Sequence, residues 1–161
     1  MIVMELLLAI EGGGTKTRVL LGDTSGAVLA REVGGPASGL YISRGTYARE
    51  ISRLLGRVKR TAEAAGGKVV SVGLGGPMDA DLVQASVRRF FGEVRFVLAA
   101  EGEIAFALHG TEWGVSLVAG TGASCRALTQ EGASTACGGF GPQFGDEGSG
   151  KGPAQITAQA F

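Results

Sequence analysis

Residues 9–17 read Ala-Ile-Glu-Gly-Gly-Gly-Thr-Lys-Thr, a run of glycines between two apolar segments. These apolar segments predict strands over 5–11 and 17–22, so the glycines form the connection between them. Glycine lets a backbone take positive φ and approach an anion without Cβ atoms in the way. With Thr15, Lys16 and Thr17 beside it, such a turn is typical of phosphate binding, although an ordinary glycine-rich hairpin has the same pattern.

A second strand–turn–strand pattern occurs later in the chain. Gly120-Thr121-Gly122 follows an apolar run over 115–119 and precedes a further candidate strand. Beyond it, residues 138–150 place Asp146 and Glu147 in a segment rich in glycine, whose backbone can fold closely round a ligand. The chain therefore holds two candidate phosphate turns and one candidate ligand loop.

Several of these segments together resemble a known family. They are, in chain order, EGGGTKT, GGPAS, GLGGP, AEGEIAF, AGTGASC and GGFGPQFGDEGSG. The chain resembles the N-acetylglucosamine kinase and BadF/BadG-type ATPase family, in the superfamily of acetate and sugar kinases, chaperone ATPases and actin, and corresponds to its N-terminal portion. The resemblance implies an α/β fold: a ribonuclease H-like (actin-like ATPase) lobe with a mixed sheet flanked by helices, plus the start of a truncated second lobe.

Local patterns predict a matching order of elements. A helix over 45–65 is indicated by apolar residues at three- and four-residue intervals: Tyr47, Ile51, Leu54, Leu55, Val58 and Ala62. Its arginines are expected to form a solvated opposite face: Arg49, Arg53, Arg57 and Arg60. The other expected elements are strands 27–33, 68–74, 93–98, 114–120 and 123–130, and helices 79–90, 101–109 and one beginning near Ser149. We expect a first lobe over 1–112 and a second over 113–161.

The composition is typical of a soluble α/β enzyme, with 45% hydrophobic and 19% charged residues and 29 glycines. The 15 basic and 15 acidic residues cancel, so we expect neither nucleic acid nor a membrane surface as a partner. The apolar start of the chain is too short to span a bilayer and lacks a signal-peptide pattern, which favours a cytoplasmic protein. Cys125 and Cys137 are expected as free thiols, facing each other if Ala136 and Cys137 pair back against the strand near Cys125.

The resemblance also implies a reaction, the transfer of the γ-phosphoryl group of Mg-ATP to a sugar hydroxyl, with N-acetylglucosamine or a related hexosamine as substrate. It places ATP at Gly12, Gly13, Gly14, Thr15, Lys16, Thr17, Gly120, Thr121 and Gly122. It assigns Glu101 as general base, Asp146 as a catalytic residue near sugar and metal, and Glu11 as the residue that holds Mg²⁺. It places the sugar at Ser38, Glu101, Ala123, Ser124 and Asp146.

The sequence departs from the family pattern at Glu11 and Glu101, where aspartate is usual. A misplacement of about 1 Å can cost on the order of a hundredfold in rate, so catalysis is not assured. Glu103 is a weaker alternative base, because two residues along a helix it points elsewhere. Three functions stay open: a sugar kinase, a BadF-type ATPase that energises a partner enzyme, and a non-catalytic remnant that binds phosphate or sugar. An unfinished second lobe would leave an open sheet edge, so we also expect a homo-oligomer.

Overall fold

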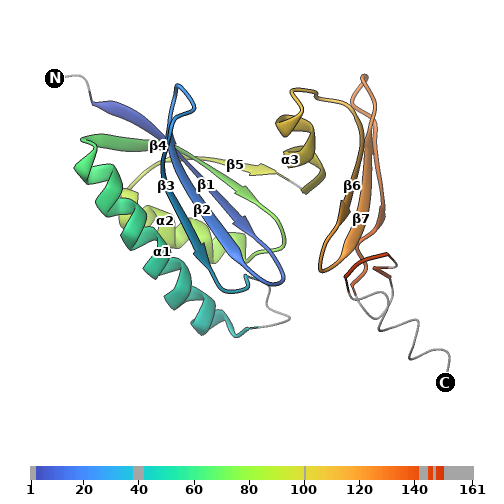
Figure 1. Cartoon of the computed structure of the whole chain (residues 1–161), viewed down its shortest axis with the longest axis horizontal. Coiled ribbons are helices and arrows are strands. Elements are labelled where there is room, and N and C mark those ends of the chain that lie inside the picture. Colours follow the sequence, from blue (N-terminus) through green and yellow to red (C-terminus); the bar gives the residue numbers. More distant parts are fainter. Residues whose placement is uncertain (1–2, 38–41, 100, 142–144, 147, 151–161) are drawn as a thin grey trace. The chain divides into compact units, whose positions relative to one another are not determined.

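The computed structural model describes residues 3–37, 42–99, 101–141, 145–146 and 148–150. The chain forms two compact units, Met1–Leu98 and Ala99–Phe161 (Figure 1), and each is described by itself. The lobe boundary predicted between residues 112 and 113 stays a prediction. The helix expected near Ser149 would lie mostly in residues outside the described ranges.

The first unit is built on a mixed five-stranded sheet with the strand order β3-β2-β1-β4-β5. The strands are β1 Met4–Gly12, β2 Thr17–Asp23, β3 Val28–Gly34, β4 Gly67–Gly75 and β5 Arg95–Ala99. Strands β1, β2 and β3 pair antiparallel, whereas β4 pairs parallel with β1. A meander followed by a parallel strand after a helical crossover confirms the predicted α/β fold class.

Two helices, α1 (Arg44–Ala64) and α2 (Ala80–Phe91), pack against each other in the first unit. Each begins at a capping side chain: Ser43 accepts from the Thr46 N–H, and Asp79 accepts from the Leu82 N–H. The predicted apolar stripe of α1 is confirmed, since all six of its residues are buried: Tyr47, Ile51, Leu54, Leu55, Val58 and Ala62.

The helices cover one face of this sheet. On β1, the side chains of Leu6, Leu8 and Ile10 are buried at 0–2% exposure, while Leu7 is 42% exposed. Successive strand side chains point to opposite faces, so the α1 and α2 face carries the core. Figure 1 shows both helices on the same side of the sheet, with the turn between β1 and β2 at one end of the strands.

The second unit contains α3 (Glu101–Leu108) and a three-stranded antiparallel sheet in the order β6-β7-β8. The strands are β6 Gly114–Ala119, β7 Ala123–Leu128 and β8 Ser134–Gly138. Helix α3 lies against β6 and β7. The stretch containing β8 was expected only as a glycine-rich loop with a short pairing, so its extent as a strand corrects the sequence-based prediction.

The expected pairing between the cysteine segments is confirmed. Cys125 on β7 lies directly opposite Cys137 on β8, and both thiols are free. Hydrogen bonds at the flanking pairs Ala123–Gly139 and Thr129–Ala133 place the two cysteines at a hydrogen-bonded position, where Cα atoms are about 5.5 Å apart. The two thiols therefore lie on the same face of the sheet, on neighbouring strands.

The register predicts a reaction with a mild oxidant. Diamide treatment of the dilute protein is expected to join Cys125 to Cys137, because the two thiols lie side by side and lose two hydrogen atoms to the reagent. Mass spectrometry of unreduced peptides would identify the link, and Cys137→Ser is the control that cannot form it. A product containing only disulfides between chains would contradict this register.

Candidate functional site

The first glycine turn joins β1 to β2 at the end of the first unit's sheet. Its last paired residues are Gly12 and Thr17, and the Gly13 N–H donates to the Lys16 carbonyl at 2.8 Å. Thr15 and Lys16 are exposed at its tip. The turn therefore has the strand–turn–strand form predicted for a phosphate loop, with one cation facing solvent.

Two neighbouring segments, one containing Ala37 and one containing Gly76 and Met78, pack closely against this turn. A Cβ atom built on Gly12 would lie 2.7 Å from the Ala37 Cβ and 2.9 Å from the Met78 Cβ. A Cβ on Gly76, where φ is +86°, would lie 2.1 Å from the Gly12 carbonyl oxygen. Gly76 belongs to the GLGGP motif and can approach the Gly12 carbonyl because it lacks a side chain, whereas the missing side chain of Gly12 leaves room for Ala37 and Met78.

The predicted phosphate ligand Thr17 has a different immediate partner. Its side chain is fully buried, and its hydroxyl donates to the Gly35 carbonyl at 2.8 Å. The Ala37 N–H in turn donates to the Gly13 carbonyl at 3.0 Å. Thr17 thus ties the glycine turn to the segment that follows β3, rather than presenting its hydroxyl to solvent.

Glu11, the predicted metal ligand, also has a partner. Its carboxylate forms an ion pair with Arg18, the residue directly opposite it on β2. Both side chains are more than 40% exposed, at 42% for Glu11 and 46% for Arg18. A metal ion at Glu11 would have to compete with this guanidinium, which sequence spacing alone did not reveal.

The second glycine turn, between β6 and β7, is held by residues from the GDEGSG motif. The Ala123 N–H donates to the Asp146 Oδ1 at 3.1 Å, and the Gly150 N–H donates to the Gly120 carbonyl at 2.7 Å. A Cβ on Gly122 would lie 3.0 Å from the Asp146 carboxylate. Two motifs more than twenty residues apart in sequence therefore meet in one site.

Asp146 has two unusual properties. It is only 6% exposed, and its φ of 69° is the only positive φ of a non-glycine residue among those described. Backbone strain of this kind costs about 1–3 kcal/mol and clusters at functional sites. The carboxylate is thus fixed beside the turn by the fold, with the Ser149 N–H donating to the Asp146 carbonyl at 3.0 Å.

The other predicted site residues fall into three groups. Thr121, Ala123 and Ser124 lie in or directly after the second turn, next to Asp146. Glu101 begins α3, but its side chain lies outside the described residues, as does all of Ser38. Glu103, the alternative base, forms an ion pair with Arg126 of β7 at 3.4 Å.

Comparisons with known proteins agree with the sequence motifs. The chain is 30% identical over 162 residues to the N-acetyl-D-glucosamine kinase of Dictyostelium discoideum, a match that covers 91% of this chain and 50% of that protein. It is 28% identical over 156 residues to the N-acetylmuramic acid/N-acetylglucosamine kinase of Clostridium acetobutylicum, with the same two coverages of 91% and 50%. No protein-family model matches. The chain is thus similar in sequence to about one half of each of these two kinases.

A solved structure supports the same relationship. The crystal structure of a candidate N-acetylglucosamine kinase from Chromobacterium violaceum superposes with a TM-score of 0.70 at 26% identity, covering 98% of this chain and 56% of that one. The fold is that of the actin-like ATPases. The chain spans about half the length of the N-acetylglucosamine kinases that it matches.

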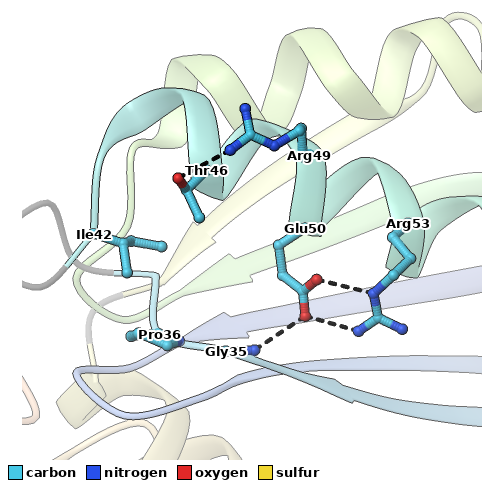
Figure 2. A pocket seen from close by; sticks show the side chains of 7 residues that line it. All are labelled: Gly35, Pro36, Ile42, Thr46, Arg49, Glu50 and Arg53. Carbon is cyan, nitrogen blue, oxygen red and sulfur yellow. Dashed lines mark hydrogen bonds and ion pairs between the residues drawn. The ribbon is translucent and has the colours of Figure 1, made fainter.

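One pocket of the first unit was not predicted from the sequence. Glu50 of α1 accepts a hydrogen bond from the Gly35 N–H at 3.1 Å and is held by Arg53, with a shortest contact of 2.7 Å (Figure 2). Together with Pro36, Thr46 and Arg49, these residues line a pocket of about 300 Å³. The arginine face of α1 was expected to be simply solvated, but Arg53 pairs with Glu50 and Arg57 with Glu32 of β3.

The Arg53 guanidinium, with the Gly35 N–H, holds the pKa of Glu50 at about 2, below its ordinary value of 4.5. A lowered pKa stabilises the folded state above about pH 4.5, and this contribution is lost as the pH falls toward 2. Because the side chain is 25% exposed, we expect a solvent-screened contribution of about 1–2 kcal/mol. Urea unfolding of the wild type and Glu50→Gln from pH 2 to 6 should show a difference that grows with pH, and a constant difference would contradict the assignment.

Proposed function

We propose that the chain acts in ATP-dependent phosphorylation of a sugar hydroxyl, with N-acetylglucosamine or a related hexosamine as acceptor. The observation that carries this proposal is the fixed position of Asp146 on the second glycine turn. A buried, strained aspartate beside a backbone turn suits a site for polar ligands more than it suits packing. The relatives are named as kinases of such sugars, which supports the same reaction.

The described residues fit the phosphate groups of ATP. Glycine turns let phosphate oxygens approach the backbone, and Lys16 adds an exposed cation at the first turn. Magnesium in phosphoryl transfer is commonly held by one or two carboxylates together with the phosphates. Glu11 would supply such a carboxylate at the first glycine turn, and no group of three or more His, Cys, Asp and Glu side chains occurs in the described part of the chain. When bound, Mg-ATP supplies the phosphoryl group and neutralises its charge.

The chain's own residues would then orient the acceptor and take its proton. We assign Glu101, the first residue of α3, to accept the proton of the sugar hydroxyl as that oxygen attacks phosphorus. Asp146 would orient the sugar with its carboxylate, beside Ala123 and Ser124 of the second glycine turn, and Ser38 keeps its sequence-based assignment to the sugar. Phosphoryl transfer needs little covalent chemistry from the protein, so positioning by these residues supplies most of the rate.

The test is ADP release by the purified chain with Mg-ATP, in the presence and absence of N-acetylglucosamine and glucose. Sugar-stimulated release that Asp146→Asn reduces at least about a hundredfold is the expected result, because a displaced or neutral partner loses orientation of the acceptor. Glu131→Gln, an exposed carboxylate in the turn before β8, is the matched control and should leave the rate unchanged. Stimulated release that Asp146→Asn does not reduce would reject the role of Asp146.

A second candidate is a non-catalytic module that binds phosphate or sugar. The ion pair between Glu11 and Arg18 favours it, because it occupies the carboxylate assigned to the metal. Calorimetric binding of Mg-ATP or N-acetylglucosamine without any ADP release would support this candidate. Arg18→Met separates the two, since freeing Glu11 should raise turnover only if the chain catalyses the reaction.

A further inference from the structure

Hydrogen bonds tie the segment Gly34–Ala37 to the first glycine turn on one side and to helix α1 on the other. The Gly35 carbonyl accepts from the Thr17 hydroxyl at 2.8 Å, and the Gly35 N–H donates to Glu50 Oε1 at 3.1 Å. The Ala37 N–H adds a third hydrogen bond, to the Gly13 carbonyl at 3.0 Å. Both polar groups of Gly35 are therefore used to fix its orientation.

The Glu50 carboxylate is oriented by Arg53, a neighbour on the same helix. The Arg53 Nε donates to Glu50 Oε2 at 2.9 Å, and the Arg53 Nη2 donates to Oε1 at 2.7 Å (Figure 2). Two parallel hydrogen bonds of this kind define the geometry of a carboxylate as well as its charge. The carboxylate is thus fixed by two bonds to Arg53, one of them to Oε1, the oxygen that the Gly35 N–H contacts.

The approach of Glu50 also depends on a missing side chain. A Cβ atom on Gly34 would lie 2.5 Å from Glu50 Oε1 and 2.8 Å from the Leu54 Cδ1. Any other residue at this position would require the side chains of Glu50 and Leu54 to move from their present positions. The glycines of the GGPAS motif therefore allow contact with the helix, as well as freedom of the backbone.

We propose that Glu50, held by Arg53, is a positioning residue that fixes the Gly34–Ala37 segment against the first glycine turn and so orients the stretch that leads in sequence to Ser38. This inference rests on the proposed function, because Ser38 directly follows the segment and is assigned there to the sugar. A surface ion pair within a helix is usually worth less than about 1 kcal/mol. Glu50 differs from such a pair because it also binds a backbone N–H of another element.

Removing the Glu50 carboxylate should change the orientation of the Gly34–Ala37 segment more than it changes the free energy of unfolding. Glu50→Ala leaves the Gly35 N–H without its acceptor, and the segment then samples other orientations. Loss of a residue that orients a binding group commonly weakens affinity about tenfold or more. Glu50→Gln keeps an acceptor oxygen for Gly35 but loses the charge that Arg53 binds, so its affinity should fall between those of Glu50→Ala and the wild type.

The experiment combines two readouts on the intact chain. Amide hydrogen exchange of Gly35 and Ala37, measured by NMR against the core amides of β1, reports the segment directly. Calorimetry with N-acetylglucosamine reports the binding site. Glu63→Gln is the matched control, because Glu63 lies in the last turn of the same helix, α1, and pairs with Lys59 at 3.7 Å.

We expect faster exchange at Gly35 and affinity lowered about tenfold in Glu50→Ala, partial recovery in Glu50→Gln, and no change in Glu63→Gln. Unchanged exchange at Gly35 in both Glu50 variants would overturn the proposal, whatever the sugar affinity. Faster exchange with unchanged affinity would overturn the link to the sugar site. Faster exchange in a chain that binds no sugar even as the wild type would support the positioning role of Glu50 and contradict the proposed substrate.

Discussion

Replacing Gly76 with alanine is expected to destabilise the first unit by at least about 3 kcal/mol, the largest effect of any single methyl group considered for this chain. The reason is twofold. Gly76 has a φ of +86°, and its Cβ would lie 2.1 Å from the Gly12 carbonyl oxygen. Because that oxygen belongs to the backbone of the first glycine turn, relief requires movement of the turn itself.

Two other glycines separate the cost of a positive φ from the cost of the contact with the Gly12 carbonyl oxygen. Gly26 has a φ of +90° with nothing within 4 Å of its Cβ position, so Gly26→Ala should cost only about 1 kcal/mol of backbone strain. Gly73 has open space without a positive φ and should tolerate alanine with little change. Free energies of unfolding from urea titration would rank the three variants. Equal losses in Gly76→Ala and Gly26→Ala would show that contact with Gly12 does not matter.

The elements most accurately predicted from sequence were those with a regular apolar pattern. The six apolar residues of α1 recur at helical spacing, and burial of a helix face depends on that spacing alone. The strands β1 and β2 were predicted to within one residue at each end, because their apolar runs are interrupted only by the glycine turn. Fold class followed from the order of these elements.

Strand β8 lacked such a signal. Its residues, Ser134–Gly138, are small and mostly exposed, so no apolar alternation distinguishes them from a loop. Pairing of this strand is determined by its neighbour β7 rather than by its own composition. The position of Cys137 opposite Cys125 was expected only on the condition that Ala136 and Cys137 pair back against the strand near Cys125, and the register meets that condition.

The candidate site was predicted as a set of motifs, but not as a set of contacts. Asp146 was identified from its motif, whereas its hydrogen bond to the Ala123 N–H joins residues 23 positions apart. Glu50 and Arg18 were not predicted as parts of a site, because backbone N–H groups and residues opposite each other across a hairpin leave no pattern in one segment. Contacts of this kind are determined by tertiary packing, which local periodicity does not describe.

Substitutions at Asp146 are expected to separate strain, hydrogen bonding and function. Asp146→Ala removes the acceptor of the Ala123 N–H but keeps a side chain at φ 69°, so the second unit should lose about 2–3 kcal/mol. Asp146→Gly removes the same acceptor but relieves the strain, and should be about 1 kcal/mol more stable than Asp146→Ala. Asp146→Asn retains an acceptor oxygen and should remain near the wild type in stability.

Thermal unfolding, followed by the fluorescence of Trp113 in the second unit, would measure this order. The rate of ADP release should not follow this order of stability. All three variants lose the carboxylate charge that the proposed sugar kinase needs, so all three should be slow. Asp146→Asn is therefore the decisive variant, since it combines a nearly intact fold with a large expected loss of ADP release. If stability and activity fell together across the three variants, Asp146 would be a structural support of the second glycine turn, and the site would have to be sought elsewhere in the chain.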